Sequence, residues 1–255
     1  NPDIVYDVHQ EFIESGAQVI TTNNYAVVPT ILEAADYAHK FQEFTQLAGR
    51  LAKAAQQDAG NTVQVAGCIP PLKSTYRPDL VENSNQAITT YSKIIEWLFD
   101  DVDVFLCESM SSITEAKLAL MALKGVNKPV WLSFIVDDLN PTKLLSGEPV
   151  EFLGQEFTDF SIQAMMFNCA QPASITQALS MLSFSGLKGG YANAFKKLDD
   201  SWNHQARKLR DLDTSITQRR YLEDVKQWIH HGATIVGGCC GIGPDYIKLL
   251  ADDLT

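Results

Sequence analysis

Two adjacent cysteines, Cys239 and Cys240, stand between glycines near the end of the sequence, and both follow an apolar run. A third cysteine, Cys169, follows another apolar run. Thiolates are preferred ligands of Zn2+, and a catalytic zinc site usually has three protein ligands and one position left for a substrate. The three thiols therefore predict a Zn2+ site with an open position, provided that the fold brings them together.

Zinc held by three thiolates would carry one formal negative charge. A fourth thiolate, supplied by a substrate, would be deprotonated by the metal and yet remain electron-rich. Such a sulfur is an activated nucleophile at neutral pH, which suits attack on a methyl group. Glycines on both sides let the backbone bend so that consecutive side chains reach one metal; they are Gly237, Gly238 and Gly241.

The cysteines also have less specific interpretations. Free cysteine is commonly a small buried hydrophobic residue, and adjacent cysteines can form a vicinal disulfide. Two thiols beside three glycines have little packing value, which favours metal binding for Cys239 and Cys240. Cys107 lies within an apolar run and is expected in the core, whereas Cys68 ends another run and is expected to border a pocket.

Composition narrows the class of protein. The 255 residues, 45% of them hydrophobic, are enough for one large domain spanning 1–255. The net charge of -11 disfavours nucleic acid as a partner. No apolar run approaches the roughly 20 residues of a membrane helix, and no secretory signal opens the chain. Five cysteines, two of them adjacent, fit a reducing compartment better than a disulfide framework, so a cytoplasmic location is expected.

Short apolar runs alternate with longer amphipathic stretches along the whole chain. Seven runs have the composition of buried parallel strands: Gln18–Thr22, Val63–Ile69, Val102–Cys107, Pro129–Val136, Ala164–Asn168, Leu187–Tyr191 and Ala233–Gly237. Between and around them, helices are predicted at Asp3–Ser15, Pro29–Ala59, Ser112–Gly125 and Thr217–His231, and from Pro244 to the end.

This alternation predicts an α/β fold with a parallel sheet. A (β/α)8 TIM-type barrel has eight strands, but only seven are legible, and the first legible element is the helix Asp3–Ser15. We therefore expect a barrel domain that is N-terminally incomplete and lacks its first β-strand, with about ten to twenty residues missing. A doubly wound open sheet is the alternative, which is weakened because no glycine-rich phosphate loop follows an early strand.

The carboxyl ends of the strands are where a barrel of this kind carries its active site. The run before Cys169 and the run before Cys239 are separated by a single strand, so their ends can converge on one ion. Glu108 follows the run Val102–Cys107, and Asn23 and Tyr25 follow the first run. Tyr76 lies in a long loop after Pro70, which is predicted to be either a lid or a rigid surface loop.

Several of these segments together resemble the homocysteine S-methyltransferase family. The segment GGCCGIGPDYI resembles its C-terminal zinc motif, and FNCAQP resembles the motif with its first zinc cysteine. Further similar segments are GAQVITTNNY, FLCESMSSITEA and GGYANA. The resemblance covers the chain from about Asn1 to the end and implies a (β/α)8 barrel that transfers a methyl group to homocysteine, giving methionine. The family's Asp-Gly-rich first strand is absent from this sequence.

The resemblance also implies roles for individual residues. Cys169, Cys239 and Cys240 match the zinc ligands. Glu108 matches an acid that binds the amino group of homocysteine, and a solvated or helix-capping acid is the less favoured alternative.

Three further residues are candidates for substrate binding. Asn23 and Tyr25 match a segment that lines the substrate pocket, where Tyr25 could lie over a sulfonium methyl group or simply pack at the rim. Asn168 precedes a ligand, and it is expected either to orient the site or to cap a loop.

The methyl donor is the least determined feature. Family members use S-methylmethionine, S-adenosylmethionine, betaine or methyl-cobalamin. The sequence ends one helix after Cys240, without the further segments of the cobalamin and betaine users, which favours a sulfonium donor, S-methylmethionine first and S-adenosylmethionine second. Betaine remains an alternative, and so does a non-catalytic zinc-thiolate protein. A metal-free aldolase-like barrel is disfavoured because it would need a lysine or paired acids at strand ends.

Overall fold

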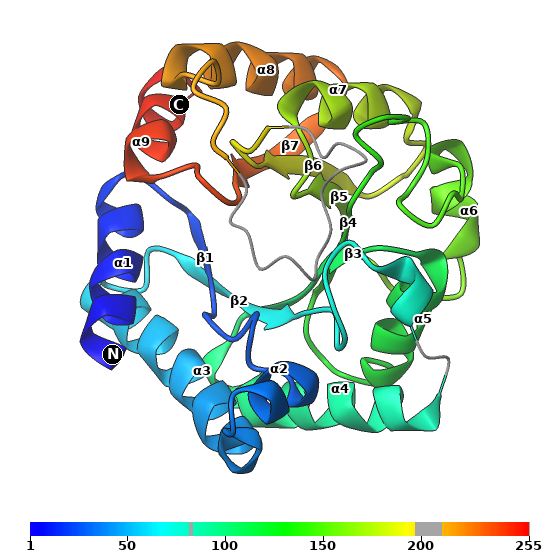
Figure 1. Cartoon of the computed structure of the whole chain (residues 1–255). Coiled ribbons are helices and arrows are strands. Elements are labelled where there is room, and N and C mark those ends of the chain that lie inside the picture. Colours follow the sequence, from blue (N-terminus) through cyan, green and yellow to red (C-terminus); the bar gives the residue numbers. More distant parts are fainter. Residues whose placement is uncertain (82–83, 197–210, 255) are drawn as a thin grey trace.

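The structure is a computed structural model that describes residues 1–81, 84–196 and 211–254. Its centre is one curled sheet of seven parallel strands in sequence order (Figure 1). All seven predicted strands are confirmed, with slightly shifted ends. They are β1 (Val19–Thr21), β2 (Gln64–Ile69), β3 (Val104–Met110), β4 (Val130–Phe134), β5 (Ala164–Asn168), β6 (Leu187–Ala192) and β7 (Ala233–Gly238).

Helices surround the outer face of the sheet (Figure 1). They are α1 (Pro2–Glu14), α2 (Pro29–Ala34), α3 (Phe41–Asp58), α4 (Asn85–Leu98), α5 (Ile113–Ala122), α6 (Leu153–Glu156), α7 (Pro172–Met181), α8 (Gln218–His230) and α9 (Pro244–Leu254). The predicted start of α5 is confirmed, because the Ser112 hydroxyl accepts a hydrogen bond from the Glu115 amide at 3.1 Å. The Glu115 carboxylate bonds Ser111 instead of completing a capping box with Ser112.

The single helix predicted for Pro29–Ala59 is wrong. The structure has two helices there, α2 and α3, because Asp36 adopts a left-handed backbone with φ 61°. The Tyr37 amide then donates to the Leu32 carbonyl at 2.7 Å, which ends α2. Apolar periodicity runs through this turn, so the pattern alone does not reveal it.

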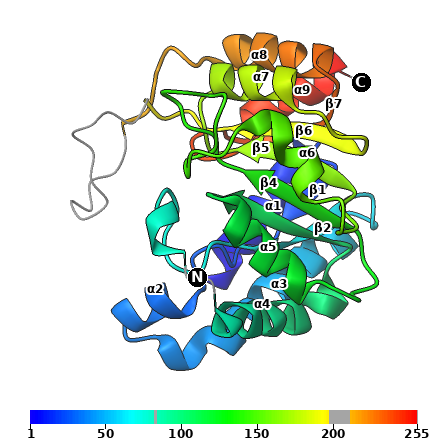
Figure 2. The same ribbon diagram turned by 90° about the vertical axis from the view of Figure 1, so that its right-hand side faces the viewer.

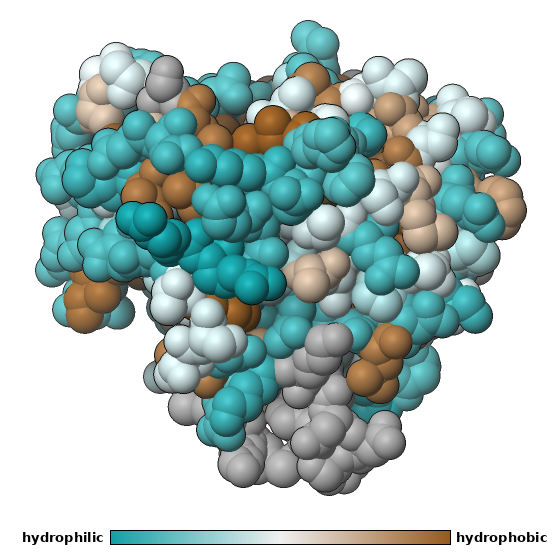
Figure 3. Space-filling model, turned by 90° about the horizontal axis from the view of Figure 1, so that it is seen from above, coloured by the Kyte–Doolittle hydropathy of each residue, from teal (hydrophilic) through white to brown (hydrophobic). Residues whose placement is uncertain are grey.

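The outer helices pack on the sheet through one apolar face each. In α8 the buried residues are Tyr221, Leu222, Val225 and Trp228. The surface above α7, α8 and α9 is mainly hydrophilic, with hydrophobic atoms in small separate groups (Figure 3). A second, smaller cluster of buried side chains includes Leu106, Trp131 and Met166 of β3, β4 and β5. The inner face of the curled sheet is therefore largely apolar, as in a TIM-type barrel.

The barrel is open between its first and last strands. In the part of the chain that the structure describes, β1 pairs only with β2 and β7 pairs only with β6. Helices α1 and α9 flank this opening (Figure 1), and they touch closely enough that a Cβ at Gly16 would lie 2.6 Å from the Ala251 Cβ. The architecture is thus that of a TIM-type barrel lacking one strand, which confirms the predicted fold class.

Helix α2, which follows β1, and the loop that follows β2 project to the same end of the sheet (Figure 2). This is the carboxyl end of the strands, where the predicted site residues lie. Among the described helices, none combines the length and the apolarity needed to cross a bilayer.

Candidate metal centre and substrate pocket

Three cysteine thiols converge at the carboxyl end of the barrel. Cys169 follows β5, and Cys239 and Cys240 follow β7. Their Sγ atoms all lie within 4.8 Å of one another, and those of Cys239 and Cys240 are 3.9 Å apart. The expectation that the ends of these two strands meet is therefore correct.

The end of β6 and the residues directly after it hold all three cysteines in place through their backbone. The Cys239 amide donates to the Ala192 carbonyl at 2.8 Å, and the Ala194 amide donates to the Cys240 carbonyl at 2.8 Å. The Cys169 amide donates to the Tyr191 carbonyl at 3.2 Å. Because Cys169 has φ 56°, an uncommon value for a residue with a side chain, its thiol is directed by a constrained turn.

Two of the three neighbouring glycines are required by the geometry. A Cβ at Gly238 would lie 2.2 Å from the Ile242 Cγ2 atom. Gly241 has φ 80°, and a Cβ there would lie 2.8 Å from the Leu212 side chain. At Gly237 the nearest contact would be an ordinary 3.7 Å. Glycine is therefore required at positions 238 and 241, as predicted. At position 237 a Cβ atom would find enough space.

This difference gives a test of how the turn is built. Gly238→Ala should lower the free energy of unfolding by about 1–3 kcal/mol, because the new methyl group overlaps the Ile242 side chain. Gly237→Ala, one residue away, should change it by less than about 0.5 kcal/mol. Urea denaturation of both variants measures the effect, and equal stabilities would contradict the packing described for Gly238.

The three thiols fit a tetrahedral zinc ion. Sulfur atoms that share such an ion at about 2.3 Å are roughly 3.8 Å apart, and the spacing of Cys239 and Cys240 agrees with this. The pKa of the Cys239 thiol is raised well above its ordinary value, first by its interactions with Cys169 and Cys240 and then by burial. Ionising several clustered thiols is therefore costly unless a cation compensates their charge. Among the described residues, this is the group whose spacing suits a metal ion.

A large cavity of about 670 Å³ extends from the barrel interior to the opening between β1 and β7. Asn23, Tyr25 and Glu108, three residues predicted to bind substrate, all line it. Gly237 and Gly238, which lead into the thiol pair, also line it. The outer part of the cavity is apolar and lies between α1 and α9, where its lining residues include Val5, Val8, Phe12, Ile247 and Leu250.

Glu108 lies at an irregularity of β3. The pairing of β3 with β4 shifts between Cys107 and Met110, and Ser109 has φ 59°. Such a bulge re-aims side chains. Burial raises the pKa of Glu108 to about 7, a hydrogen bond with Cys68 lowers it, and the negative charge of Cys240 raises it. The carboxyl group thus lies close to the thiol cluster in a place where a cationic partner would favour its ionised form.

Asn168 is not among the residues that line the cavity, and its role in substrate binding stays a prediction. Its Oδ1 atom accepts hydrogen bonds from the Ser109 amide at 3.0 Å and the Ser133 hydroxyl at 2.7 Å. Its Nδ2 atom donates to the Ser109 hydroxyl at 2.7 Å. The side chain therefore links the ends of β3, β4 and β5 by hydrogen bonds. This fits the prediction that Asn168 orients the site rather than the prediction that it caps a loop.

Two residues near the site were given no individual role from the sequence: Tyr191 was not singled out, and Tyr76 was named only as part of a loop that could be a lid. The Tyr191 hydroxyl is buried without a hydrogen bond of good geometry and lies near the Glu108 carboxyl. The Tyr76 hydroxyl contacts Cys169, donating to its carbonyl at 2.8 Å and lying 3.0 Å from its Sγ atom. The run Leu187–Tyr191 predicts a strand but does not show which of its side chains face inward, and no local signal places Tyr76 against Cys169. The other predicted core and border cysteines, Cys107 and Cys68, are both fully buried.

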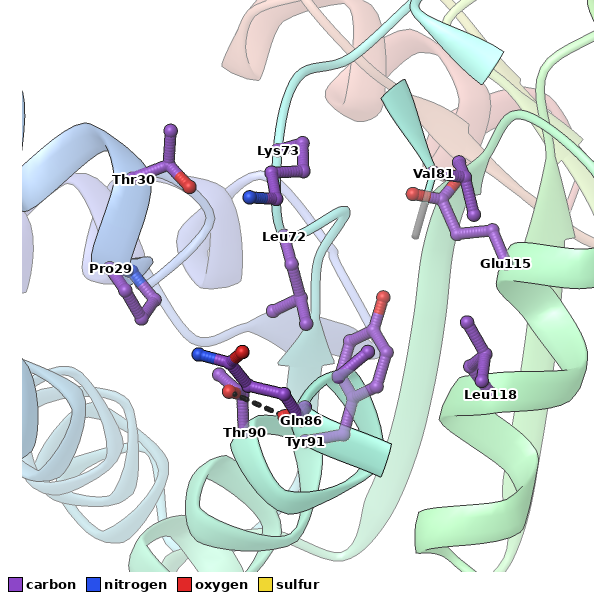
Figure 4. Close-up of a pocket in the computed structure, with 11 residues that line it drawn as sticks. Pro29, Thr30, Leu72, Lys73, Val81, Gln86, Thr90, Tyr91, Glu115 and Leu118 are labelled. Carbon is purple, nitrogen blue, oxygen red and sulfur yellow. Dashed lines mark hydrogen bonds between the residues drawn. The ribbon is translucent and has the colours of Figure 1, made fainter. Parts of the chain in front are cut away.

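A second cavity of about 90 Å³ is lined in part by the loop between β2 and α4, the loop that carries Tyr76 (Figure 4). Leu72 and Lys73 of this loop reach it from one side, and Tyr91 and Glu115 from α4 and α5 (Figure 4). The Glu115 carboxylate already accepts bonds from Ser111. This small cavity therefore shows incomplete packing beside the loop rather than a second candidate site.

Comparison with known proteins agrees with this geometry. The sequence profile of the family described as homocysteine S-methyltransferase matches residues 1–254. Among solved structures, the homocysteine methyltransferase MmuM from Escherichia coli superimposes in its metallated form with a TM-score of 0.81 at 22% identity, covering 99% of this chain and 85% of that one. Its oxidised form gives a TM-score of 0.80 at 20% identity, with the same coverage of 99% and 85%.

The fold and the thiol cluster thus define a TIM-type barrel protein with a candidate metal centre at the carboxyl end of its strands. The profile match extends over nearly the whole chain. The chain belongs to the homocysteine S-methyltransferase family, and its activity is the methylation of homocysteine.

Proposed function

We propose that this methyltransferase binds one Zn2+ through Cys169, Cys239 and Cys240 and moves a methyl group from a sulfonium donor to the sulfur of homocysteine, forming methionine. The observation that carries the proposal is the convergence of three thiols within 4.8 Å beside the large cavity. When bound there, zinc would act as a Lewis acid that lowers the pKa of the substrate thiol at neutral pH.

Glu108 is proposed to hold the amino group of homocysteine. Its carboxyl group lines the cavity and lies near Cys240. A substrate ammonium group would supply the missing cationic partner and return the carboxyl to its charged form. The homocysteine would then be anchored at one end by Glu108, with its sulfur directed toward the cysteines.

Asn23 and Tyr25 are proposed to border the place of the methyl donor. The Tyr25 hydroxyl is fixed by a 2.7 Å hydrogen bond to the Thr75 hydroxyl. An aromatic ring in this position can attract a sulfonium methyl group through cation–π interaction. The described residues that line the cavity include a glutamate but neither lysine nor arginine. This favours a cationic donor and fits both a sulfonium compound and betaine.

The donor can be assigned by measuring methionine formation from homocysteine with each candidate in turn. We expect kcat/KM to be highest with S-methylmethionine and lower with S-adenosylmethionine and betaine by at least about tenfold, or roughly 1.4 kcal/mol in transition-state binding. Highest activity with betaine would contradict the sulfonium assignment. Zinc binding without methionine formation from any donor would favour the non-catalytic alternative.

Residues 1–255 are proposed to form one domain that is completed by an additional parallel strand between β1 and β7. Both strands present unpaired edges to the opening, and unpaired backbone groups are costly unless they find partners. Hydrogen exchange measures this directly: the outward amides of β1 and β7 should exchange fast in residues 1–255 alone and slowly in a form that supplies the strand.

The thiols also bear on location and partners. All five cysteines are free, and a thiolate site requires reduced sulfur. We therefore propose a reducing compartment, the cytoplasm, and small molecules as the partners of this acidic protein.

A further inference from the structure

The loop between β2 and α4 reaches across the site to Cys169. It carries Tyr76, whose hydroxyl lies 2.8 Å from the Cys169 carbonyl oxygen and 3.0 Å from its Sγ atom. The two residues are 93 positions apart in the sequence. This contact is a specific one, because it joins a loop after β2 to a predicted metal ligand after β5.

The backbone of this loop is constrained around Tyr76. Tyr76 has φ 64°, in the left-handed region that residues with side chains rarely adopt. The preceding residue, Thr75, is tied to the end of β1 by its 2.7 Å hydrogen bond to Tyr25. Leu72, Lys73 and Val81 of the same loop line the cavity of about 90 Å³ (Figure 4). The hydrogen bonds of Thr75 and Tyr76 therefore fix the part of the loop nearest the site, while Leu72 and Val81 pack on the core.

A hydroxyl group has one proton, and the two contacts of Tyr76 compete for it. When Cys169 is a thiol, its S–H can donate to the Tyr76 oxygen while Tyr76 donates to the Cys169 carbonyl. When Cys169 is a thiolate, the sulfur has no proton and can only accept. The Cys169 carbonyl also accepts a 2.7 Å hydrogen bond from the Asn193 amide group, so it stays satisfied if the hydroxyl proton turns to the sulfur.

We propose that Tyr76 is a positioning residue that donates a hydrogen bond to the Cys169 thiolate in the metal-loaded protein. The bond holds residues 70–81 over the metal centre and withdraws electron density from the sulfur. This inference rests on the proposed metal site. It adds to that site a residue outside the three ligands. This residue lowers the electron density on the sulfur of Cys169 and holds its loop over the metal centre.

The test compares Tyr76→Phe with the wild-type protein, each loaded with Co2+ in place of zinc. Loss of a hydrogen bond to a thiolate raises the energy of its sulfur electrons, so the sulfur-to-cobalt charge-transfer band should move to lower energy. Transfer of zinc to a chelator should also become about tenfold faster. The zinc content of the freshly loaded protein should stay at the wild-type value.

Two further variants separate the hydrogen bond to sulfur from loop attachment. Thr75→Val removes the bond to Tyr25 without touching Cys169, so it should speed transfer to the chelator and leave the cobalt band unmoved. Tyr37→Phe changes a tyrosine that is 51% exposed and is not among the residues that line the large cavity, so it should alter neither readout.

The outcomes distinguish the two levels of the proposal. An unshifted band in Tyr76→Phe, beside a wild-type protein that shows the sulfur-to-cobalt band, overturns the role of Tyr76 and leaves the metal site intact. A wild-type protein without any such band overturns the metal site and the role of Tyr76 together.

Discussion

Replacing Cys239 and Cys240 together with serine should remove zinc and lower kcat/KM for methionine formation by at least about a thousandfold, or roughly 4 kcal/mol. A serine hydroxyl is not deprotonated at neutral pH and is a poor zinc ligand, and Cys169 alone does not form a site. Elemental analysis of the purified variant gives the metal content, and an assay with homocysteine and the best donor gives the rate.

Cys107→Ala is the matched control for this experiment. Cys107 is fully buried within β3, outside the thiol cluster. The control should keep its zinc and most of its activity, although it will lose some stability because of the cavity created. Full zinc occupancy in the Cys239→Ser, Cys240→Ser variant would show that the metal is bound elsewhere.

Glu108→Gln should weaken homocysteine binding by roughly 1–3 kcal/mol, the usual cost of losing a charged hydrogen-bond partner. Glutamine has nearly the same shape, so the cavity and the zinc content should not change. Isothermal titration of the zinc-loaded variant measures the affinity. If homocysteine binds as tightly as it does to the wild-type protein, Glu108 has only a structural role.

The same substitution should stabilise the protein without substrate. Glu108 has a folded-state pKa of about 7, raised by burial from its ordinary 4.5. A raised pKa means that the protonated form contributes stability below about pH 4.5 and that this contribution is lost as the pH rises to about 7. At pH 8, Glu108→Gln should therefore unfold with a free energy higher by on the order of 1–2 kcal/mol. Equal urea midpoints at pH 8 would argue against a buried carboxylate.

The fold was predictable because each strand is a short apolar run between polar stretches. Buried parallel strands need this composition on both faces, and the seven runs identified from it match β1 to β7. The open barrel also followed from the strand count. Helices α2 and α3 were not separated, because the turn at Asp36 depends on a single backbone angle that apolar spacing does not encode.

The candidate site was predictable to the extent that it lies at strand ends. Cys169, Cys239 and Cys240 meet because parallel strands present their carboxyl ends together, and Glu108 lines the cavity for the same reason. The contacts of Tyr76 and Asn168 could not be predicted from the sequence. They depend on the tertiary structure, which places Tyr76 against Cys169 and lets Asn168 bind Ser109 instead of facing the cavity.

The central claim is that three cysteines hold a zinc ion and leave one position for the substrate sulfur. X-ray absorption at the zinc edge, recorded with and without homocysteine, counts the sulfur neighbours of the metal. We predict three sulfur neighbours in the free protein and four after homocysteine is added. Fewer than three sulfur atoms in the free protein, or a count that homocysteine leaves unchanged, would contradict the account.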